Sequence, residues 1–308
     1  MQRIHRLRAN IQQCYLGHDA VVDKVIVCLL ARGHLLIEDV PGVGKTTLAS
    51  ALARSFDVSL ARVQLTPDML PADVLGVTVW DNQQSEFRFK PGPIFANIVL
   101  ADEINRTTPR TQSALLEAMA EGQVSIDGLT RKLVEPFLVI ATQNPHEFEG
   151  TYFLPESQLD RFLMRIHLGY PAPEEEARIL ATDPTRTTLA DLRPVMTAEE
   201  LVQLQNDCRK VEVDPTLTDY IVSIANATRN HEHLQIGVSP RGSLALLGAA
   251  KATAMLNGRD YVVPDDITTN VQDVFAHRCI SNSYLHDADQ ELVPNVIREI
   301  LETLPSPV

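Results

Sequence analysis

Short apolar segments recur through the first half of the chain, and stretches with a helical pattern separate several of them. Apolar runs that alternate with helices are typical of a parallel sheet covered on both faces. The expected helices include 46–56 and 111–121. Residues 1–33 also have a helical pattern, which breaks at Gly17 and His18. The expected strands are 34–38, 58–65, 98–101, 137–142 and 164–168.

The pattern changes after Tyr170-Pro171-Ala172-Pro173, because no strong strand signal follows. Thr197-Ala198-Glu199-Glu200 has the pattern of a capping box at the start of a helix. Three later prolines stand where the first turn of a helix tolerates them, at Pro215, Pro240 and Pro264. We therefore predict two domains, an α/β domain over residues 1–171 and an all-helical domain over residues 172–308.

Two insertions interrupt the alternation of strands and helices, and both have the pattern of a β-hairpin. The first, 78–89, contains the turn signal Asp81-Asn82, and the second, 124–133, contains Asp127-Gly128. Insertions on an α/β core usually carry contacts with partners, although each could also be a plain surface loop.

The composition is that of an ordinary water-soluble globular protein, with 44% hydrophobic residues and a mean hydropathy of −0.05. No apolar run has the roughly 18 residues that a membrane span needs, and no signal peptide is apparent, so we expect a cytoplasmic protein. The formal net charge of −13 lowers the expectation of a large nucleic-acid footprint, which is usually basic. The scattered cysteines have no metal-ligand spacing: Cys14, Cys28, Cys208 and Cys279.

One segment combines the end of a strand, a glycine-containing turn and the start of a helix. Glycine lets the backbone approach an anion closely, and its N–H groups can then bind phosphate oxygens. The lysine that follows can reach the outer phosphates, and the Thr46 hydroxyl can bind Mg²⁺. We therefore expect a nucleoside triphosphate to bind the segment Pro41, Gly42, Val43, Gly44, Lys45, Thr46 and Thr47.

This segment departs from the usual phosphate-loop pattern at one position, where Asp39 replaces the first glycine. The remaining elements, Gly42, Gly44, Lys45 and Thr46, are intact. A side chain at position 39 lies away from the closest phosphate approach, so we expect the loop to function.

A second apolar strand ends in two adjacent acids, Asp102 and Glu103. At the end of a strand beside the phosphate loop, Asp102 would bind Mg²⁺, directly or through water. Glu103 is placed to orient and polarise an attacking water as a general base, which favours hydrolysis over transfer. Asn144 follows another strand and could hydrogen-bond the water or the terminal phosphate, although an Asn before Pro is also a common turn.

These motifs occur in the order found in AAA+ ATPases, and the chain resembles the MoxR family most. The resemblance extends from about residue 10 to residue 300. It rests on Phe89-Lys90-Pro91-Gly92-Pro93, Glu103-Ile104-Asn105-Arg106, Ala141-Thr142-Gln143-Asn144-Pro145, Leu154-Pro155-Glu156, Leu159-Asp160-Arg161-Phe162 and Gly237-Val238-Ser239-Pro240-Arg241.

The resemblance implies a P-loop core with a parallel five-stranded sheet and a C-terminal helical lid. It makes Lys45 and Thr46 the Walker A residues, and Asp102 and Glu103 the Walker B residues. It also implies that 78–89 is a helix-2 insert and 124–133 a pre-sensor-1 hairpin. Other roles implied are sensor 1 for Asn144, arginine finger for Arg161, sensor 2 for Arg241, and proximity to the base for Gly17 and His18.

The assignments of the arginines leave alternatives open. Arg106 and Arg165 also lie near the expected subunit interface, and either could be the finger. Arg161 could instead form an ion pair with Asp160 or Glu156, and Arg241 could face solvent.

The resemblance further implies an ATPase that uses Mg²⁺, forms a ring of six copies and remodels or assembles protein partners. Partners with a von Willebrand factor A domain are typical of the family. A nucleic-acid motor is the main alternative, although the net charge and the low aromatic content of 5% argue against base stacking in a channel. A regulatory scaffold with incidental hydrolysis is a third possibility.

Overall fold

A parallel sheet of five strands forms the centre of the first half of the chain. The computed structural model describes residues 2–40, 42–144, 151–182, 188–282 and 286–307. The strand order is β2-β5-β8-β1-β9, and every neighbouring pair is parallel. The strands are β1 (Leu35–Glu38), β2 (Leu60–Gln64), β5 (Ile98–Asp102), β8 (Leu138–Gln143) and β9 (Met164–Ile166). The predicted sheet is confirmed, and each strand begins within two residues of its expected start.

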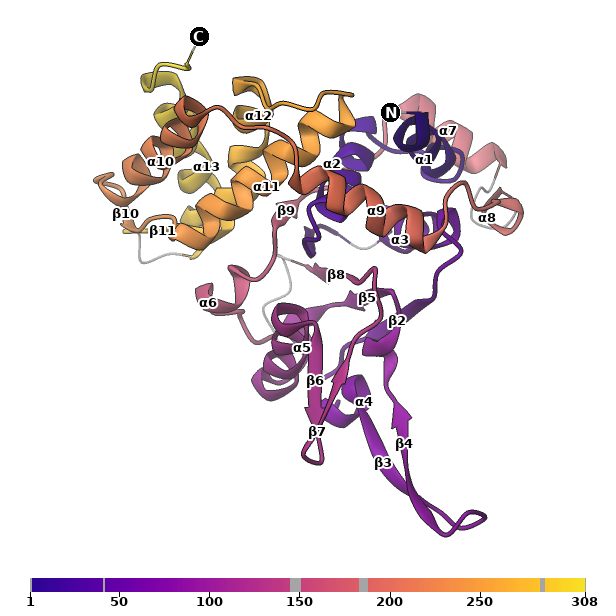
Figure 1. The fold of residues 1–308 in the computed structure, drawn as a ribbon. Helices are drawn as coiled ribbons and strands as arrows, with labels where there is room; N and C mark the ends of the chain where they lie inside the picture. Colours follow the sequence, from indigo (N-terminus) through magenta and orange to yellow (C-terminus); the bar gives the residue numbers. More distant parts are fainter. Residues whose placement is uncertain (1, 41, 145–150, 183–187, 283–285, 308) are drawn as a thin grey trace.

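Helices bury both faces of this sheet (Figure 1). Successive residues of β5 alternate between two apolar clusters: Ile98 and Leu100 belong to one, and Val99 and Ala101 to the other. Burial on both faces explains why the strands have continuous apolar runs. Three helices share the first cluster, α1 (Gln2–Gln12), α2 (Asp19–Leu30) and α3 (Lys45–Ser55), and α5 (Pro109–Glu121) belongs to the second.

The later part of the chain is mostly helical, as predicted. The Thr197 hydroxyl accepts from the N–H of Glu200 at 3.2 Å and completes the expected capping box. Prolines occupy the first turns of α10, α11 and α12, as expected. The helices are α7 (Pro173–Thr182), α8 (Thr188–Asp191), α9 (Ala198–Arg209), α10 (Pro215–Arg229), α11 (Pro240–Leu256), α12 (Pro264–Phe275) and α13 (His286–Thr303).

A short antiparallel pair, β10 (Leu234–Ile236) and β11 (Ile280–Ser281), was not expected in the helical region. These strands of three and two residues are too short to show an alternating pattern in the sequence. A 3₁₀ turn, η3 (Ala276–Arg278), lies between α12 and β11.

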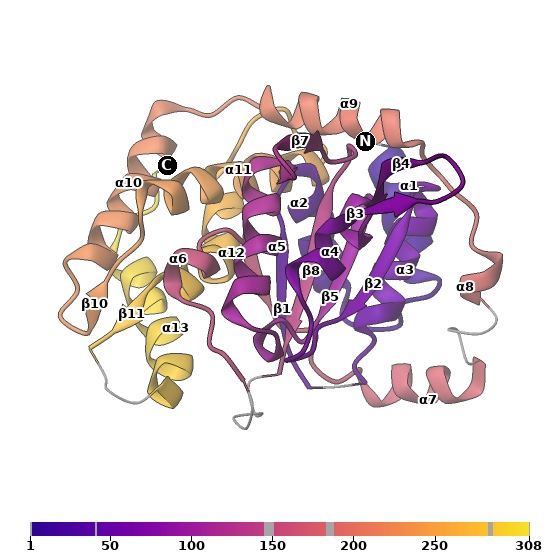
Figure 2. The same cartoon turned by 90° about the horizontal axis from the view of Figure 1, so that it is seen from below.

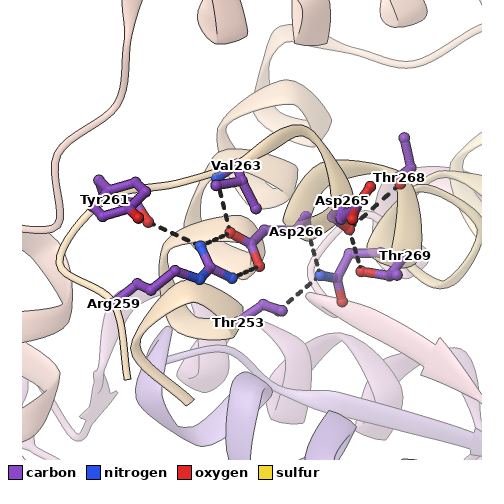
Figure 3. Close-up of polar contacts among 9 residues, drawn as sticks. Thr253, Arg259, Tyr261, Val263, Asp265, Asp266, Thr268 and Thr269 are labelled. Atoms are coloured by element: carbon purple, nitrogen blue, oxygen red, sulfur yellow. Dashed lines mark hydrogen bonds and ion pairs between the residues drawn. The ribbon is translucent and has the colours of Figure 1, made fainter. Parts of the chain in front are cut away.

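Partly buried polar contacts hold the connection between α11 and α12 (Figure 3). Arg259 donates two hydrogen bonds of 2.6 Å to the two carboxylate oxygens of Asp266. Asp266 also accepts from the N–H of Val263 at 2.9 Å and so closes the start of α12. Lys24 of α2 forms an ion pair of 2.8 Å with Asp273 of α12. This contact connects α2 to the helical region.

Both insertions are antiparallel hairpins. The first pairs β3 (Gly76–Asp81) with β4 (Glu86–Pro91) after the short α4 (Pro71–Leu75). It projects away from the body of the molecule, downward in Figure 1 and towards the viewer in Figure 2. The second pairs β6 (Gln123–Ile126) with β7 (Leu129–Lys132). The rings of Trp80 and Phe87 meet edge to face on the first hairpin, with 51% and 73% of these residues exposed.

No helix among the described residues combines the length and the apolar composition that crossing a membrane requires.

A buried histidine before β1 gives the fold a testable pH dependence. His34 Nδ1 accepts from the N–H of Val139 at 3.0 Å, so Nε2 carries the proton and donates to the carbonyl of Met119 at 3.1 Å. Burial lowers the pKa of His34 from 6.5 to about 4. Because the unfolded chain binds this proton more readily, stability is lost as the pH falls from 6.5 towards 4.

We expect His34 to make the free energy of unfolding about 2 kcal/mol lower at pH 5 than at pH 7.5. Urea unfolding at the two pH values, for the native chain and for His34→Gln, measures this difference. Other buried groups titrate in both proteins, so the comparison isolates His34. An equal pH dependence in the two proteins would contradict the prediction.

Candidate nucleotide-binding site

The ends of three neighbouring strands surround a cavity of about 290 Å³. Because β1, β5 and β8 are parallel, the loops that follow them meet at one edge of the sheet, where ligands of α/β proteins usually bind. The lining residues come from these loops, from the start of α3 and from β2. They are Asp39, Gly42, Gly44, Lys45, Thr46, Thr47, Arg62, Gln64, Asp102, Glu103, Thr142 and Asn144.

Two glycines shape the loop between β1 and α3. Gly42 and Gly44 have φ angles of +90° and +96°, which glycine adopts without strain. Gly44 caps α3, so the positive end of the helix dipole faces the cavity. Lys45 lies across the loop and donates to the carbonyl of Asp39 at 2.6 Å. Pro41 lies outside the described residues.

Burial lowers the pKa of Lys45, while Asp39, Asp102 and Glu103 oppose that shift. The cavity therefore holds a lysine between acidic groups, and the phosphates of a nucleotide would add negative charge beside it.

The carboxylate of Asp39 connects the loop to the chain that leaves β9. Its Oδ2 accepts from the N–H groups of Leu168 and Gly169 at 2.7 and 2.8 Å, and its Oδ1 accepts from Val40 at 2.9 Å. A glycine could make none of these side-chain contacts. The unusual residue thus has a structural role, which depends on residues about 130 positions later in the chain.

The first acid, Asp102, ends β5 and is almost fully buried. Arg62 donates from Nε to its Oδ2 at 2.7 Å, and the hydroxyl of Thr142 lies 3.3 Å from its Oδ1. Asp102 and Thr46 line the same cavity, so a carboxylate and a hydroxyl face one space. Oxygen donors of this kind suit Mg²⁺.

The second acid, Glu103, has a left-handed backbone with φ +58° and ψ +54°. A residue other than glycine in this conformation is strained, and such strain is concentrated at functional sites. Its Oε2 accepts from Gln64 Nε2 at 2.8 Å and lies 3.2 Å from Arg106 Nε, in the 3₁₀ turn η2 (Ile104–Arg106). The backbone N–H of Glu103 donates to the Thr142 hydroxyl at 3.0 Å.

The sequence did not single out Arg62 and Gln64 as residues of the site. They lie two positions apart on β2, so they share one face of the strand, and Gln64 pairs with Asp102 in the sheet register. The sequence feature that could have identified them is that both are polar residues within a predicted strand. Only the order of the strands shows that this face lies beside the acids.

Asn144 lies directly after β8 and lines the cavity with the two acids. The phosphate loop, both acids and this asparagine are thus brought together. Pro145, which follows in the predicted motif, is outside the described residues.

A second cavity, of about 140 Å³, adjoins the phosphate loop and shares Gly42, Gly44 and Thr47 with the first. Gly17 lines it, and a Cβ at position 17 would lie 2.6 Å from the Tyr15 ring.

Burial raises the pKa of Tyr15, and Asp39 and Glu175 add to the shift. His18 is not among the lining residues, and its Nε2 approaches Gly169 instead. The other lining residues are Cys14, Tyr15, Leu16, Val43, Gly169, Pro171 and Ile179.

The two arginines predicted to act on the nucleotide lie outside the lining of both cavities. Arg161 is half-buried and donates from Nη1 to the carbonyl of Leu116 in α5 at 2.8 Å. Its neighbour Asp160 pairs with Arg278 at 2.7 Å. Arg241 is exposed in the first turn of α11.

The other two arginines near the site contact acids of their own chain. Arg165 lies 3.2 Å from the buried Glu38, which also accepts from Gln143 at 2.6 Å. Arg106 contacts Glu103, as described above.

Comparison with known proteins agrees with this arrangement. Residues 34–164 match the family model described as "ATPase family associated with various cellular activities (AAA)", and residues 226–300 match the AAA lid domain. Chaperone MoxR1 of Mycobacterium tuberculosis is 40% identical over 99% of this chain and 82% of its own length. The chain belongs to the MoxR family of AAA+ ATPases.

Two further similarities extend over nearly the whole chain. The uncharacterized protein YeaC of Bacillus subtilis is 47% identical over 97% of this chain and 93% of its own length. The crystal structure of a suggested ATPase from Cytophaga hutchinsonii has a TM-score of 0.91 and 35% identity, and the match covers 100% of this chain and 96% of that one. The MoxR-family resemblance and the AAA+ core with a helical lid are thus confirmed.

The contacts of Asp39 predict that restoring the glycine of the usual phosphate-loop pattern at position 39 destabilises this protein. We expect Asp39→Gly to lower the free energy of unfolding by about 2 kcal/mol, because three backbone N–H groups lose a charged acceptor. Asp39→Asn keeps one acceptor oxygen and should cost less. Urea unfolding of the three proteins measures the order, and equal stability of the glycine variant and the native chain would contradict it.

Proposed function

We propose that this protein binds ATP with Mg²⁺ and hydrolyses it. The observation that carries the proposal is the single cavity shared by the phosphate loop, Asp102 and Glu103. The N–H groups at Gly42 and Gly44 and the side chain of Lys45 bind the phosphates. The second cavity, beside Gly17 and Tyr15, accepts the base and ribose.

Thr46 and Asp102 would hold Mg²⁺ through their oxygens. When bound, the ion neutralises charge on the outer phosphates. Arg62 holds the Asp102 carboxylate in place through a hydrogen bond of 2.7 Å to its Oδ2.

Glu103 acts as the general base for the attacking water. Gln64 and Arg106 both contact its Oε2, and we assign Oε1 to the water. These contacts fix the orientation of the carboxylate, and a fixed base is more effective because little reorganisation is needed. Asn144 hydrogen-bonds the water or the terminal phosphate.

We propose Arg161 as the arginine finger that reaches the nucleotide of a neighbouring copy. Arg165 and Arg106 are engaged with Glu38 and Glu103 of their own chain, which makes them less suitable. A finger from a neighbour requires a head-to-tail interface, and such an interface gives a ring when its rotation closes. A ring of six copies, as in AAA+ proteins, fits this proposal. Arg241 at the start of α11 acts as sensor 2 and couples the helical region to the phosphates.

The ring would act as a chaperone-like machine of the cytoplasm on a protein partner, such as one with a von Willebrand factor A domain. The word chaperone in the name of MoxR1 supports this assignment. The exposed Trp80 and Phe87 on the projecting hairpin are suitable contacts, since aromatic residues dominate binding energy at interfaces. A nucleic-acid motor is the competing function.

Glu103→Gln should bind ATP with unchanged affinity and hydrolyse it at least about 100-fold more slowly, because the general base is lost. Lys45→Ala should lose binding. Equilibrium binding of a fluorescent ATP analogue and phosphate release measure the two effects. Glu117→Gln, an exposed acid in α5, is the matched control and should resemble the native chain.

Hydrolysis at the native rate by Glu103→Gln would contradict the assignment of the base. Stimulation of the native rate by DNA, with a steep salt dependence, would favour the nucleic-acid motor instead.

Arg161→Ala should retain ATP affinity but hydrolyse about 10³-fold more slowly, because a finger supplied by a neighbour stabilises charge in the transition state. Mixing this variant with Glu103→Gln subunits should restore turnover, since each variant supplies what the other lacks. Native turnover by Arg161→Ala alone would reject the finger assignment.

A further inference from the structure

A buried arginine of the helical region holds the segment that carries Arg161. Arg278 of η3 has a side chain that is 3% exposed, and it pairs through Nε with Asp160 at 2.7 Å. Its Nη2 donates to the carbonyl of Phe162 at 2.5 Å, and its Nη1 donates to that of Leu163 at 3.2 Å. One side chain thus holds three of the four residues from 160 to 163.

The held segment lies between the helical region and the α/β core. On the side of the core, Arg161 donates from Nη1 to the carbonyl of Leu116 in α5, and Phe162 belongs to the apolar cluster that contains Leu116. The N–H of Leu163 donates to the carbonyl of His34 at 2.8 Å, just before β1. Phe162 is fully buried. The position of Arg161 therefore depends on contacts from both sides.

Arg278 also packs against the first turn of α11. A Cβ at Gly242 would lie 2.9 Å from Arg278 Cδ, so only glycine leaves room for this side chain. Gly242 follows Arg241, the proposed sensor 2. The positive charge of Arg241 contributes to lowering the pKa of Arg278. The side chain of Arg278 thus contacts both the start of α11 and the segment around Arg161.

We infer that Arg278 is a positioning residue for the proposed arginine finger. A shift of α11 relative to the core, when nucleotide binds beside Arg241, moves Arg278 and with it residues 160–163. The nucleotide state of one subunit thereby sets the position of the Arg161 that serves the next subunit. This inference rests on the proposed function of Arg161 as a finger supplied to a neighbour.

Arg278→Lys tests the inference. Lysine retains the charge opposite Asp160, but its single ammonium group cannot reach the set of carbonyls that the planar guanidinium spans. We expect kcat to fall about tenfold or more with KM for ATP unchanged, because small misplacement of a catalytic group costs rate.

The decisive measurement is turnover after mixing with Glu103→Gln subunits. These subunits cannot hydrolyse ATP but present a correctly held Arg161 to their neighbours. Turnover per Arg278→Lys subunit should therefore recover in the mixture. A lesion confined to the subunit's own active site would not recover.

Arg259→Lys is the matched control. Arg259 is also an arginine of the helical region with a carboxylate partner, but its contacts lie in the α11–α12 connection (Figure 3). It should lower the unfolding temperature and leave turnover at the native level. This separates a general loss of stability from loss of finger position.

The outcomes distinguish this inference from the proposed function. Native turnover by a folded Arg278→Lys protein overturns it, and so does a low turnover that mixing fails to restore while Arg161→Ala is restored. Native turnover by Arg161→Ala instead overturns the finger itself. If Arg278→Lys does not fold, Asp160→Asn takes its place, with a smaller loss of kcat and the same recovery expected on mixing.

Discussion

Burial of the central strands on both faces confines polar chemistry to the edge where the strands end. Glu38, Asp102 and Thr142 are all buried polar residues at or near that edge. A buried carboxylate is costly unless it has a partner, so each acid is matched by a cation or a donor. The resulting contacts, Glu38 with Arg165 and Asp102 with Arg62, build a rigid rim around the phosphate loop.

The same constraint bears on how an acidic protein would bind the polyanion that we propose as its ligand. Three arginines around the cavity are already neutralised by acids of the chain, and the net charge is −13. In the proposed function, attraction for phosphate would thus depend on Lys45, on backbone N–H groups and on the dipole of α3 rather than on a broad basic surface. Binding of this kind is local and selects the geometry of a phosphate chain.

Local patterns were sufficient to predict the phosphate loop, the strand before Asp102 and Glu103, and the proline-initiated helices. Each depends on residues within one turn or one strand. The contacts of Asp39 with Leu168 and of Asp160 with Arg278 could not be predicted, because they join positions 129 and 118 residues apart. Arg62 and Gln64 required the order of the strands. The roles proposed for Arg161 and Arg241 rest on the family resemblance, because neither arginine lines either of the two cavities beside the phosphate loop of its own chain.

The projecting hairpin has a spectroscopic consequence. Trp80 is the only tryptophan in the chain, and it is half exposed beside Phe87, away from the hydrophobic clusters. Intrinsic tryptophan emission therefore reports directly on the surroundings of the hairpin rather than on the hydrophobic clusters. Binding of a partner at the hairpin would thus change the fluorescence of the native chain without any added label.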